Sequence, residues 1–481
     1  MRRITRAAAA VTGLGLFVLL IAMPAAEAAV FNPDSFTLKN GLRVVVIENH
    51  RVPIVTHMVW YKVGAADERR GKSGIAHFLE HLMFKGTKTL KPGEFSRIVA
   101  RNGGRGNAFT SSDYTAYFQS VAADRLETVM RLEADRMANL VLTEKVVRPE
   151  LKVVIEERRM RTDNRPAALL REEATATLYA NSPYGIPVIG WEREMRQMTA
   201  KRALAFYHRY YAPNNAILVV AGDITAARLK PLAEKYYGVI PARPIPPRLR
   251  PQEPAHHAPR RVVLRDERVG QPAWARRYLA PSYMSAGKEN AFPLQVLSEI
   301  LGGGTTSRLY RRLVVEQKLA VNAGAWYQPN SVDRTAFGLF ATPRPGVDTA
   351  RLETAMQAEI DKVLAEGVTA AEVETAKTRL STAAIYARDS VGTGAHIFGA
   401  ALAIGRTVAE VEAWPDHIAA VTADQVKAAA AVVFQARNSV TSVLLPKRRV
   451  GTPARTTRPS PVGARSRAPD KVPAKTGAGA R

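Results

Sequence analysis

The chain has 481 residues, 46% of them hydrophobic, and carries a formal net charge of +26. This length exceeds that of one ordinary core, so we expect two or more packed domains. The absence of cysteine excludes disulfides, thiolate metal ligands and a cysteine nucleophile, so any metal ion must be held by histidine, aspartate or glutamate.

Residues 1–28 have the pattern of a secretory signal peptide. The positive segment MRRITR precedes the apolar run AVTGLGLFVLLIAM and a small-residue cleavage pattern, Ala26-Glu27-Ala28. The apolar run is shorter than the roughly 20 residues that cross a bilayer, and it is not amphipathic as a mitochondrial presequence is. We therefore expect export to a bacterial periplasm. An uncleaved signal that anchors the chain in the membrane is the alternative.

The segment after the signal mixes strand and helix patterns. FTLKNGLRVVVIENH, residues 36–50, alternates around an Asn40-Gly41 hairpin turn. RLETVMRLEADRMANL, residues 125–140, has apolar positions at helical spacing. Together these patterns predict an α+β fold.

The stretch GIAHFLEHLMFKGT, residues 74–87, places His77 and His81 four residues apart, with Glu80 directly before the second histidine. On a helix both imidazoles lie on one face, where they can reach a single ion. The order H-x-x-E-H is the inverted zinc-peptidase motif. The alternative is a solvated helix face that carries two histidines by chance.

A catalytic zinc usually takes a third protein ligand. RPELKVVIEERRM, residues 148–160, offers Glu150 and Glu157, which are seven apart and share a helical face. Glu156 points about 100 degrees away from Glu157. Periodicity alone does not choose among these residues, and a helix so rich in charge is commonly a solvated face.

Residues 240–259, IPARPIPPRLRPQEPAHHAP, contain too much proline for a helix or a central strand. They are predicted to link an N-terminal zinc-binding domain, residues 33–239, to a C-terminal domain, residues 260–446. His256 and His257 lie in this linker, where we expect exposed side chains rather than ligands.

The two domains resemble copies of each other. Residues 198–222 match residues 421–445 at a constant offset of 223, each segment reading as a threonine-capped helix, a break and a β-rich run. HFLEHLMFKGT, residues 77–87, similarly lies over QVLSEILGGGT, residues 295–305. The second copy lacks the histidines, so we expect no metal site in the C-terminal domain.

The chain ends in a basic segment, residues 447–481, that is predicted to be a disordered tail. Residues 446–481 carry ten basic side chains and one acidic side chain. No aromatic residue stands among these arginines, so base stacking is unsupported and no nucleic-acid partner is expected. The tail could touch an anionic surface, and binding of a polyanion through it is a minor alternative function.

Several segments together resemble the pitrilysin or insulinase-type zinc peptidases, and within them the branch of the mitochondrial processing peptidase. The similarity covers about residues 33–446. It implies two homologous α+β domains that form a half-chamber, and a zinc-dependent endopeptidase acting on peptides or unfolded polypeptides. The segments are HFLEH (77–81), NAFTSSDYTAYF (107–118), LEADRMANL (132–140), PELKVVIEE (149–157), YYAPNNAILVVAGD (210–223) and LGGGTTSRLYRRL (301–313).

The resemblance also implies roles for individual residues. Glu157 matches the third zinc ligand beside His77 and His81, and Glu150 matches a supporting acid. Zinc held there would lower the pKa of a bound water towards about 7 and polarise the scissile carbonyl. Glu80 would take the proton of the water and pass it to the leaving amine.

Asn107 and Ala108 match the strand that lies beside the zinc in this family. They would hold the substrate backbone by strand addition. A strand with a purely structural role is the alternative.

One segment departs from the family pattern. Members that act alone carry an arginine and a tyrosine, seven apart, that hold the substrate carbonyl, whereas this chain has Val314 and Val321 there. We therefore expect it to be the zinc-bearing half of a heterodimer with a homologous subunit that lacks the zinc motif. A homodimer is one alternative, and a catalytically silent assembly subunit is another. The homodimer would need a substitute clamp from Arg311, Arg312 or Tyr327.

Overall fold

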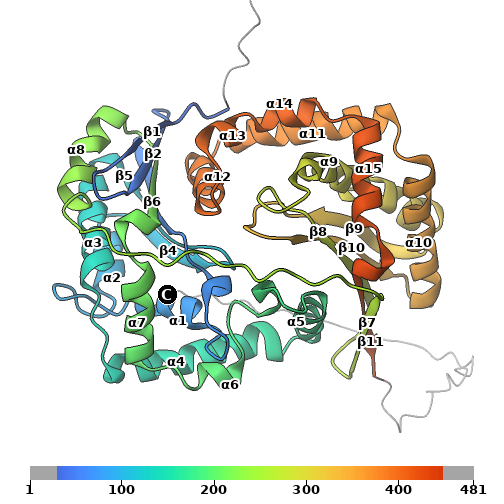
Figure 1. The fold of residues 1–481 in the computed structure, drawn as a ribbon, viewed down its shortest axis with the longest axis horizontal. Helices are drawn as coiled ribbons and strands as arrows, with labels where there is room; N and C mark the ends of the chain where they lie inside the picture. Colours follow the sequence, from blue (N-terminus) through green and yellow to red (C-terminus); the bar gives the residue numbers. More distant parts are fainter. Residues whose placement is uncertain (1–29, 448–481) are drawn as a thin grey trace, which may run out of the picture.

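The computed structural model describes residues 30–447 of the chain. The predictions for the signal peptide, and for the tail beyond Lys447, lie outside this range. Within it, two β-sheets with flanking helices form two lobes (Figure 1), which confirms the α+β class and the two similar domains. None of the helices between residues 30 and 447 is long and apolar enough to cross a membrane.

The first sheet has six strands in the order β1-β2-β6-β3-β5-β4. β1 and β2 form the antiparallel hairpin expected from the sequence. Its turn contains Gly41 at a φ of 86°, a left-handed conformation that glycine adopts without strain. The strands are β1 (Asp34–Thr37), β2 (Arg43–Glu48), β3 (Ile54–Tyr61), β4 (Arg105–Thr110), β5 (Thr115–Ala122) and β6 (Ala216–Gly222).

The second sheet has five strands in the order β7-β11-β8-β10-β9. If β1 is left out, the order β2-β6-β3-β5-β4 of the first sheet corresponds strand by strand to the order of the second sheet. The parallel pair has the same place in both, β2 with β6 and β7 with β11. The strands are β7 (Arg260–Asp266), β8 (Ala273–Ala280), β9 (Ala320–Tyr327), β10 (Thr335–Pro343) and β11 (Ser439–Pro446).

Helices cover both sheets. In the N-terminal half they are α1 (Ile75–Leu82), α2 (Glu94–Arg101), α3 (Leu126–Asn139), α4 (Glu144–Arg158), α5 (Pro166–Leu178), α6 (Glu192–Met195), α7 (Ala200–Tyr210) and α8 (Ala226–Tyr236). In the C-terminal half they are α9 (Ala291–Gly302), α10 (Thr349–Glu366), α11 (Ala370–Ala387), α12 (Val391–Ala403), α13 (Val408–Glu412), α14 (Trp414–Ala419) and α15 (Ala423–Val433).

The internal repeat appears directly in these bounds. α7 and β6 begin at Ala200 and Ala216, and α15 and β11 begin at Ala423 and Ser439, which keeps the offset of 223 found in the sequence. The side chains of Thr199 and Thr422 accept hydrogen bonds from backbone N–H groups of the first turns of α7 and α15, as helix-capping threonines do.

Each half of the chain also covers part of the sheet of the other half (Figure 1). α12 packs against the first sheet, where Phe398 and Leu402 join a buried cluster with Trp60 and Val219. α5 packs against the second sheet, where Leu178 joins a cluster with Val440. A sheet with two apolar faces needs a covering layer on each face, and here one covering helix of each sheet comes from the other half of the chain. The two spatial lobes therefore do not coincide with the ranges 33–239 and 260–446.

The linker between the halves has no helix or strand. It contacts both halves, because the Arg248 guanidinium donates to the Asp113 carbonyl of the N-terminal half and to the Ala403 carbonyl of the C-terminal half. Arg250 pairs with Asp67 at 2.7 Å and with Asp113 at 2.8 Å.

The expectation that both linker histidines are exposed was wrong for His256, which is 8% exposed. Its imidazole contacts Glu253 at 2.9 Å, and the Glu253 carboxylate accepts hydrogen bonds from the backbone N–H groups of Asn181 and Ser182. This part of the linker therefore folds back against the N-terminal half instead of crossing solvent.

Candidate metal and active site

The centre of the site is α1, which carries His77, Glu80 and His81. The helix begins after Gly74, whose φ is 87° and where a Cβ would come within 2.6 Å of the Ile189 carbonyl oxygen. The carboxylate of Glu68 accepts hydrogen bonds from the N–H groups of Gly74 at 2.9 Å and Ala76 at 2.8 Å. Glu68 thus satisfies donors that have no partner inside the helix. Sequence reasoning missed this residue, because it lies outside the motif.

The structure brings His77, His81 and Glu157 together. Their ligand atoms all lie within 4.8 Å of one another. Glu157 lies on α4, with its Oε2 atom 3.6 Å from His77 Nε2 and 3.2 Å from His81 Nε2. This Oε2 atom is buried and accepts no hydrogen bond from residues 30–447, so a cation between the three side chains would satisfy it. Two imidazoles and one carboxylate form a donor set that suits zinc.

The structure separates Glu156 from this group. The carboxylate of Glu156 is 59% exposed and pairs with Arg159. The carboxylate of Glu157 is 16% exposed, and its Oε1 atom lies 2.8 Å from Arg161. The direction in which α4 faces α1 therefore selects Glu157 from two adjacent glutamates.

Glu150 contacts the nitrogen of His81 that faces away from the candidate metal position. Its Oε1 atom is 2.9 Å from His81 Nδ1, and its other oxygen pairs with Lys85. A carboxylate on the far nitrogen of an imidazole directs the near nitrogen toward a metal. Lys85 was missed at the sequence level, since one lysine among many has no distinguishing pattern.

The two histidines differ in their electrostatic environment. Burial, together with the charge of His81, lowers the pKa of His77 to about 4. Burial also acts to lower the pKa of His81, but the hydrogen bond with Glu150 and the nearby negative charge of Glu157 outweigh it and raise this pKa to about 9. An imidazole must be neutral to bind a metal, so metal binding here requires loss of the His81 proton.

Glu80 is placed beside this group without joining it. Its side chain is buried, with the residue 9% exposed, and its Oε2 atom accepts a hydrogen bond of 2.6 Å from Thr110 Oγ1. Burial raises the pKa of Glu80, which brings a carboxylate closer to the range useful for proton transfer.

Asn107 and Ala108 lie on β4, the same strand as Thr110. β4 is the last strand of the first sheet and pairs only with β5 within the described range. Asn107 is exposed and Ala108 is partly exposed. The outer edge of β4 thus pairs with no other strand of the described range next to the candidate metal group, and the Ala108 N–H there donates to the Asn107 side-chain oxygen at 2.9 Å.

The residues at the positions of the missing arginine and tyrosine do not face this site. Val314 is buried in the core of the second lobe, and Val321 is 43% exposed on β9. Of the proposed substitutes, Tyr327 donates its hydroxyl hydrogen to the Pro281 carbonyl at 2.6 Å. Arg311 and Arg312 both lie within 4 Å of Glu316. Tyr327 would therefore have to break its hydrogen bond with Pro281 before its hydroxyl could hold a substrate carbonyl.

Comparison with known proteins adds independent information. Residues 43–191 match the family model described as insulinase (peptidase family M16), and residues 197–380 match the model described as peptidase M16 inactive domain. The chain is 35% identical to the zinc protease PqqE of Helicobacter pylori over 368 residues, which is 75% of this chain and 81% of that protein. It is 27% identical to the uncharacterized zinc protease YmxG of Bacillus subtilis over 74% of this chain and 85% of that protein.

A solved structure extends this similarity to three dimensions. The crystal structure of a protease from Helicobacter pylori matches with a TM-score of 0.80 and 32% sequence identity, covering 86% of this chain and 99% of that chain. The match therefore includes both lobes and the linker between them.

Proposed function

Because the chain belongs to the insulinase family of peptidases, peptidase family M16, we propose that it is a zinc-dependent endopeptidase that hydrolyses peptides or unfolded polypeptides. The observation that carries this proposal is the grouping of His77, His81 and Glu157 beside Glu80. Relatives named zinc proteases support it. A catalytically silent subunit is less well supported, because nothing in a silent subunit requires these four side chains to converge.

The proposed zinc ligands are His77, His81 and Glu157, with Glu150 holding His81 in position. When bound, zinc supplies Lewis-acid chemistry, which lowers the pKa of a water and polarises a carbonyl. Lys85 neutralises part of the charge of Glu150, and Arg161 does the same for Glu157. These contacts fix the ligand side chains before a metal arrives.

Glu80 is the proposed general base and acid. Its Oε1 or Oε2 atom takes a proton from the attacking water and then transfers it to the nitrogen of the leaving amine. The hydrogen bond from Thr110 holds this carboxylate at 2.6 Å. The buried setting keeps bulk water away from the transferred proton.

The open edge of β4 is the proposed substrate site. A substrate in extended conformation adds to this edge through backbone hydrogen bonds at Asn107 and Ala108. Because backbone groups carry this recognition, it favours unfolded chains over folded domains and depends little on sequence.

We further propose that the protein acts in a heterodimer and is exported. Val314 and Val321 have no group that can hold a developing oxyanion, so a homologous subunit that retains the arginine and the tyrosine would complete the site. The signal-like segment at residues 1–28 motivates a periplasmic location. A signal that remains as an anchor is the alternative, and fractionation of cells with detection of the chain at its amino terminus distinguishes the two.

The test is cleavage of an unstructured peptide by the zinc-loaded protein. We expect cleavage to stop with a chelator, return with zinc, and fall about 10²-fold to 10⁴-fold in Glu80→Gln with the metal content unchanged. Near-normal turnover of Glu80→Gln would remove Glu80 from the mechanism. Removal of residues 448–481 should leave cleavage intact, whereas loss of all activity would favour a function based on the tail.

A further inference from the structure

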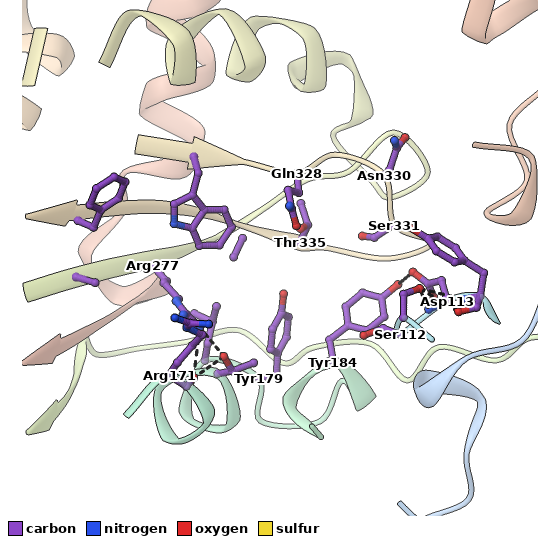
Figure 2. A pocket seen from close by; sticks show the side chains of 18 residues that line it. Ser112, Asp113, Arg171, Tyr179, Tyr184, Arg277, Gln328, Asn330, Ser331 and Thr335 are labelled. Carbon is purple, nitrogen blue, oxygen red and sulfur yellow. Dashed lines mark hydrogen bonds between the residues drawn. The ribbon is translucent and has the colours of Figure 1, made fainter. Parts of the chain in front are cut away.

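A pocket of about 760 Å³ lies between the two halves of the chain. It is lined by α5 and the loop after β4 from the N-terminal half, and by β8, β9 and β10 from the C-terminal half (Figure 2). Ser111 and Ser112 line it directly after β4 ends at Thr110. Thr110 contacts Glu80, and consecutive Cα atoms are about 3.8 Å apart. The pocket therefore begins within a few ångströms of the strand that is proposed to bind substrate.

Two arginines lie at one end of this pocket, and one aspartate lies at the other (Figure 2). Asp113 is already neutralised, because its carboxylate contacts Arg250 at 2.8 Å and accepts hydrogen bonds from the Tyr184 hydroxyl at 2.6 Å and the Val332 N–H at 3.1 Å. The remaining charge of the pocket lining is therefore positive.

Neither arginine has a carboxylate partner within 4 Å in the part of the chain that the structure describes. Arg171 is exposed on α5, and Arg277 is half-buried on β8. The Nη1 atom of Arg277 donates to Thr175 Oγ1 and, at 3.5 Å, to the Arg171 carbonyl oxygen, which leaves the N–H donors of Nε and Nη2 unused within residues 30–447. Burial, followed by repulsion from Arg171, lowers the pKa of Arg277. A half-buried guanidinium that lacks an anion is costly, so an incoming anion is favoured.

Trp326 forms the part of the pocket wall that lies beside Arg277. Arg277 pairs in register with Gly338 of β10, and Gly338 pairs with Trp326 of β9. A Cβ at Gly338 would come within 2.1 Å of the Trp326 ring, so the absence of a side chain allows the indole to lie across β10. The Trp326 ring centre is 5.8 Å from the Arg277 guanidinium carbon. This ring holds the guanidinium by a cation–π contact without consuming its hydrogen-bond donors.

We propose that this pocket is a subsite that binds a carboxylate of the peptide substrate through Arg277 and Arg171. Arginine recognises carboxylates by paired, charge-assisted hydrogen bonds. The inference rests on the proposed peptidase function, because it assumes that a peptide lies along β4. It adds a preference for acidic or carboxyl-terminal residues that backbone recognition alone does not supply.

The carboxylate can come from two sources. A substrate strand antiparallel to β4 directs its amino-terminal part toward the pocket, where an aspartate or glutamate side chain would reach the arginines. A parallel strand directs its carboxyl-terminal part there, where the terminal carboxylate would do so. Peptides that differ only in these groups separate the two sources.

The experiment measures binding of labelled peptides to zinc-loaded Glu80→Gln protein by fluorescence anisotropy. One peptide has no acidic residue and an amidated end; the second restores the free carboxyl end, and a third set places one glutamate at successive positions. We expect a carboxylate to tighten binding about tenfold or more, and Arg277→Gln to abolish this gain. Arg171→Gln should reduce it. The Arg351→Gln control removes the same charge from an exposed site on α10 and should retain it.

Equal binding of all peptides, or a preference that survives both Arg277→Gln and Arg171→Gln, would overturn the proposal. If Arg277→Gln fails to fold, the test uses Arg171→Gln, which changes an exposed residue, and Arg277→Lys, which keeps the charge. Both should weaken the preference for a carboxylate, because lysine cannot form the paired hydrogen bonds of arginine. Cleavage by wild-type protein is measured separately on the peptide without acids. Cleavage without carboxylate preference rejects the subsite alone, whereas preference without cleavage of any peptide rejects the peptidase function alone.

Discussion

Replacing Glu150 by glutamine provides a graded test of how the proposed metal site is held together. The change keeps the shape of the side chain but removes the charge that lies 2.9 Å from His81 Nδ1 and the partner of Lys85. Loss of such a supporting carboxylate typically weakens metal binding about 10-fold to 100-fold. We expect a zinc Kd increased by that factor, measured by competition with a chromophoric chelator.

Two other glutamates of α4 calibrate the result. Glu157→Gln removes a ligand; since about 10–16 kcal/mol of zinc binding is shared by four ligands in structural sites, one ligand accounts for roughly 3 kcal/mol, or more than about 100-fold. Glu156→Gln removes an exposed carboxylate and should leave the Kd unchanged. The expected order of effects is therefore Glu157, then Glu150, then Glu156. A larger effect at Glu156 than at Glu157 would show that the ligand assignment is wrong.

Three further predictions concern the surroundings of the site. Thr110→Val should lower kcat about tenfold with zinc content unchanged, because Glu80 loses the hydrogen bond that positions it; an unchanged kcat would show that this bond is dispensable. Glu68→Ala should destabilise the zinc-free protein by about 1–3 kcal/mol, since two N–H groups at the start of α1 lose their acceptor. Urea unfolding measures this, with the exposed Glu173→Ala as control, and equal stability of both variants would contradict the capping role. Finally, the purified chain alone should cleave peptides slowly, and addition of a homologous subunit with the missing arginine and tyrosine should raise the rate about 10²-fold to 10³-fold; full activity without a second polypeptide would rule out the heterodimer.

Several features of this protein follow from local sequence alone. The spacing of His77 and His81 already places both imidazoles on one helical face, because helix geometry is set by the backbone. The hairpin at Asn40-Gly41 and the capping of α7 and α15 by threonine are local as well. The α+β class and the internal repeat could be predicted for the same reason.

Other features depend on which elements meet in space, and periodicity carries no information about that. Glu156 and Glu157 are neighbours of identical chemistry, and only the packing of α4 against α1 directs one of them to the histidines while the other reaches solvent. The burial of His256 requires the linker to fold back on the protein.

The exchange of covering helices and the arginine pocket are also tertiary features. An apolar helix face indicates that something covers it, but it does not indicate that α12 covers the first sheet and α5 the second. Arg171 and Arg277 are 106 residues apart in the chain and stand among many basic residues. They become a pair only because α5 crosses to the second sheet and leaves the face of β8, β9 and β10 open beside it.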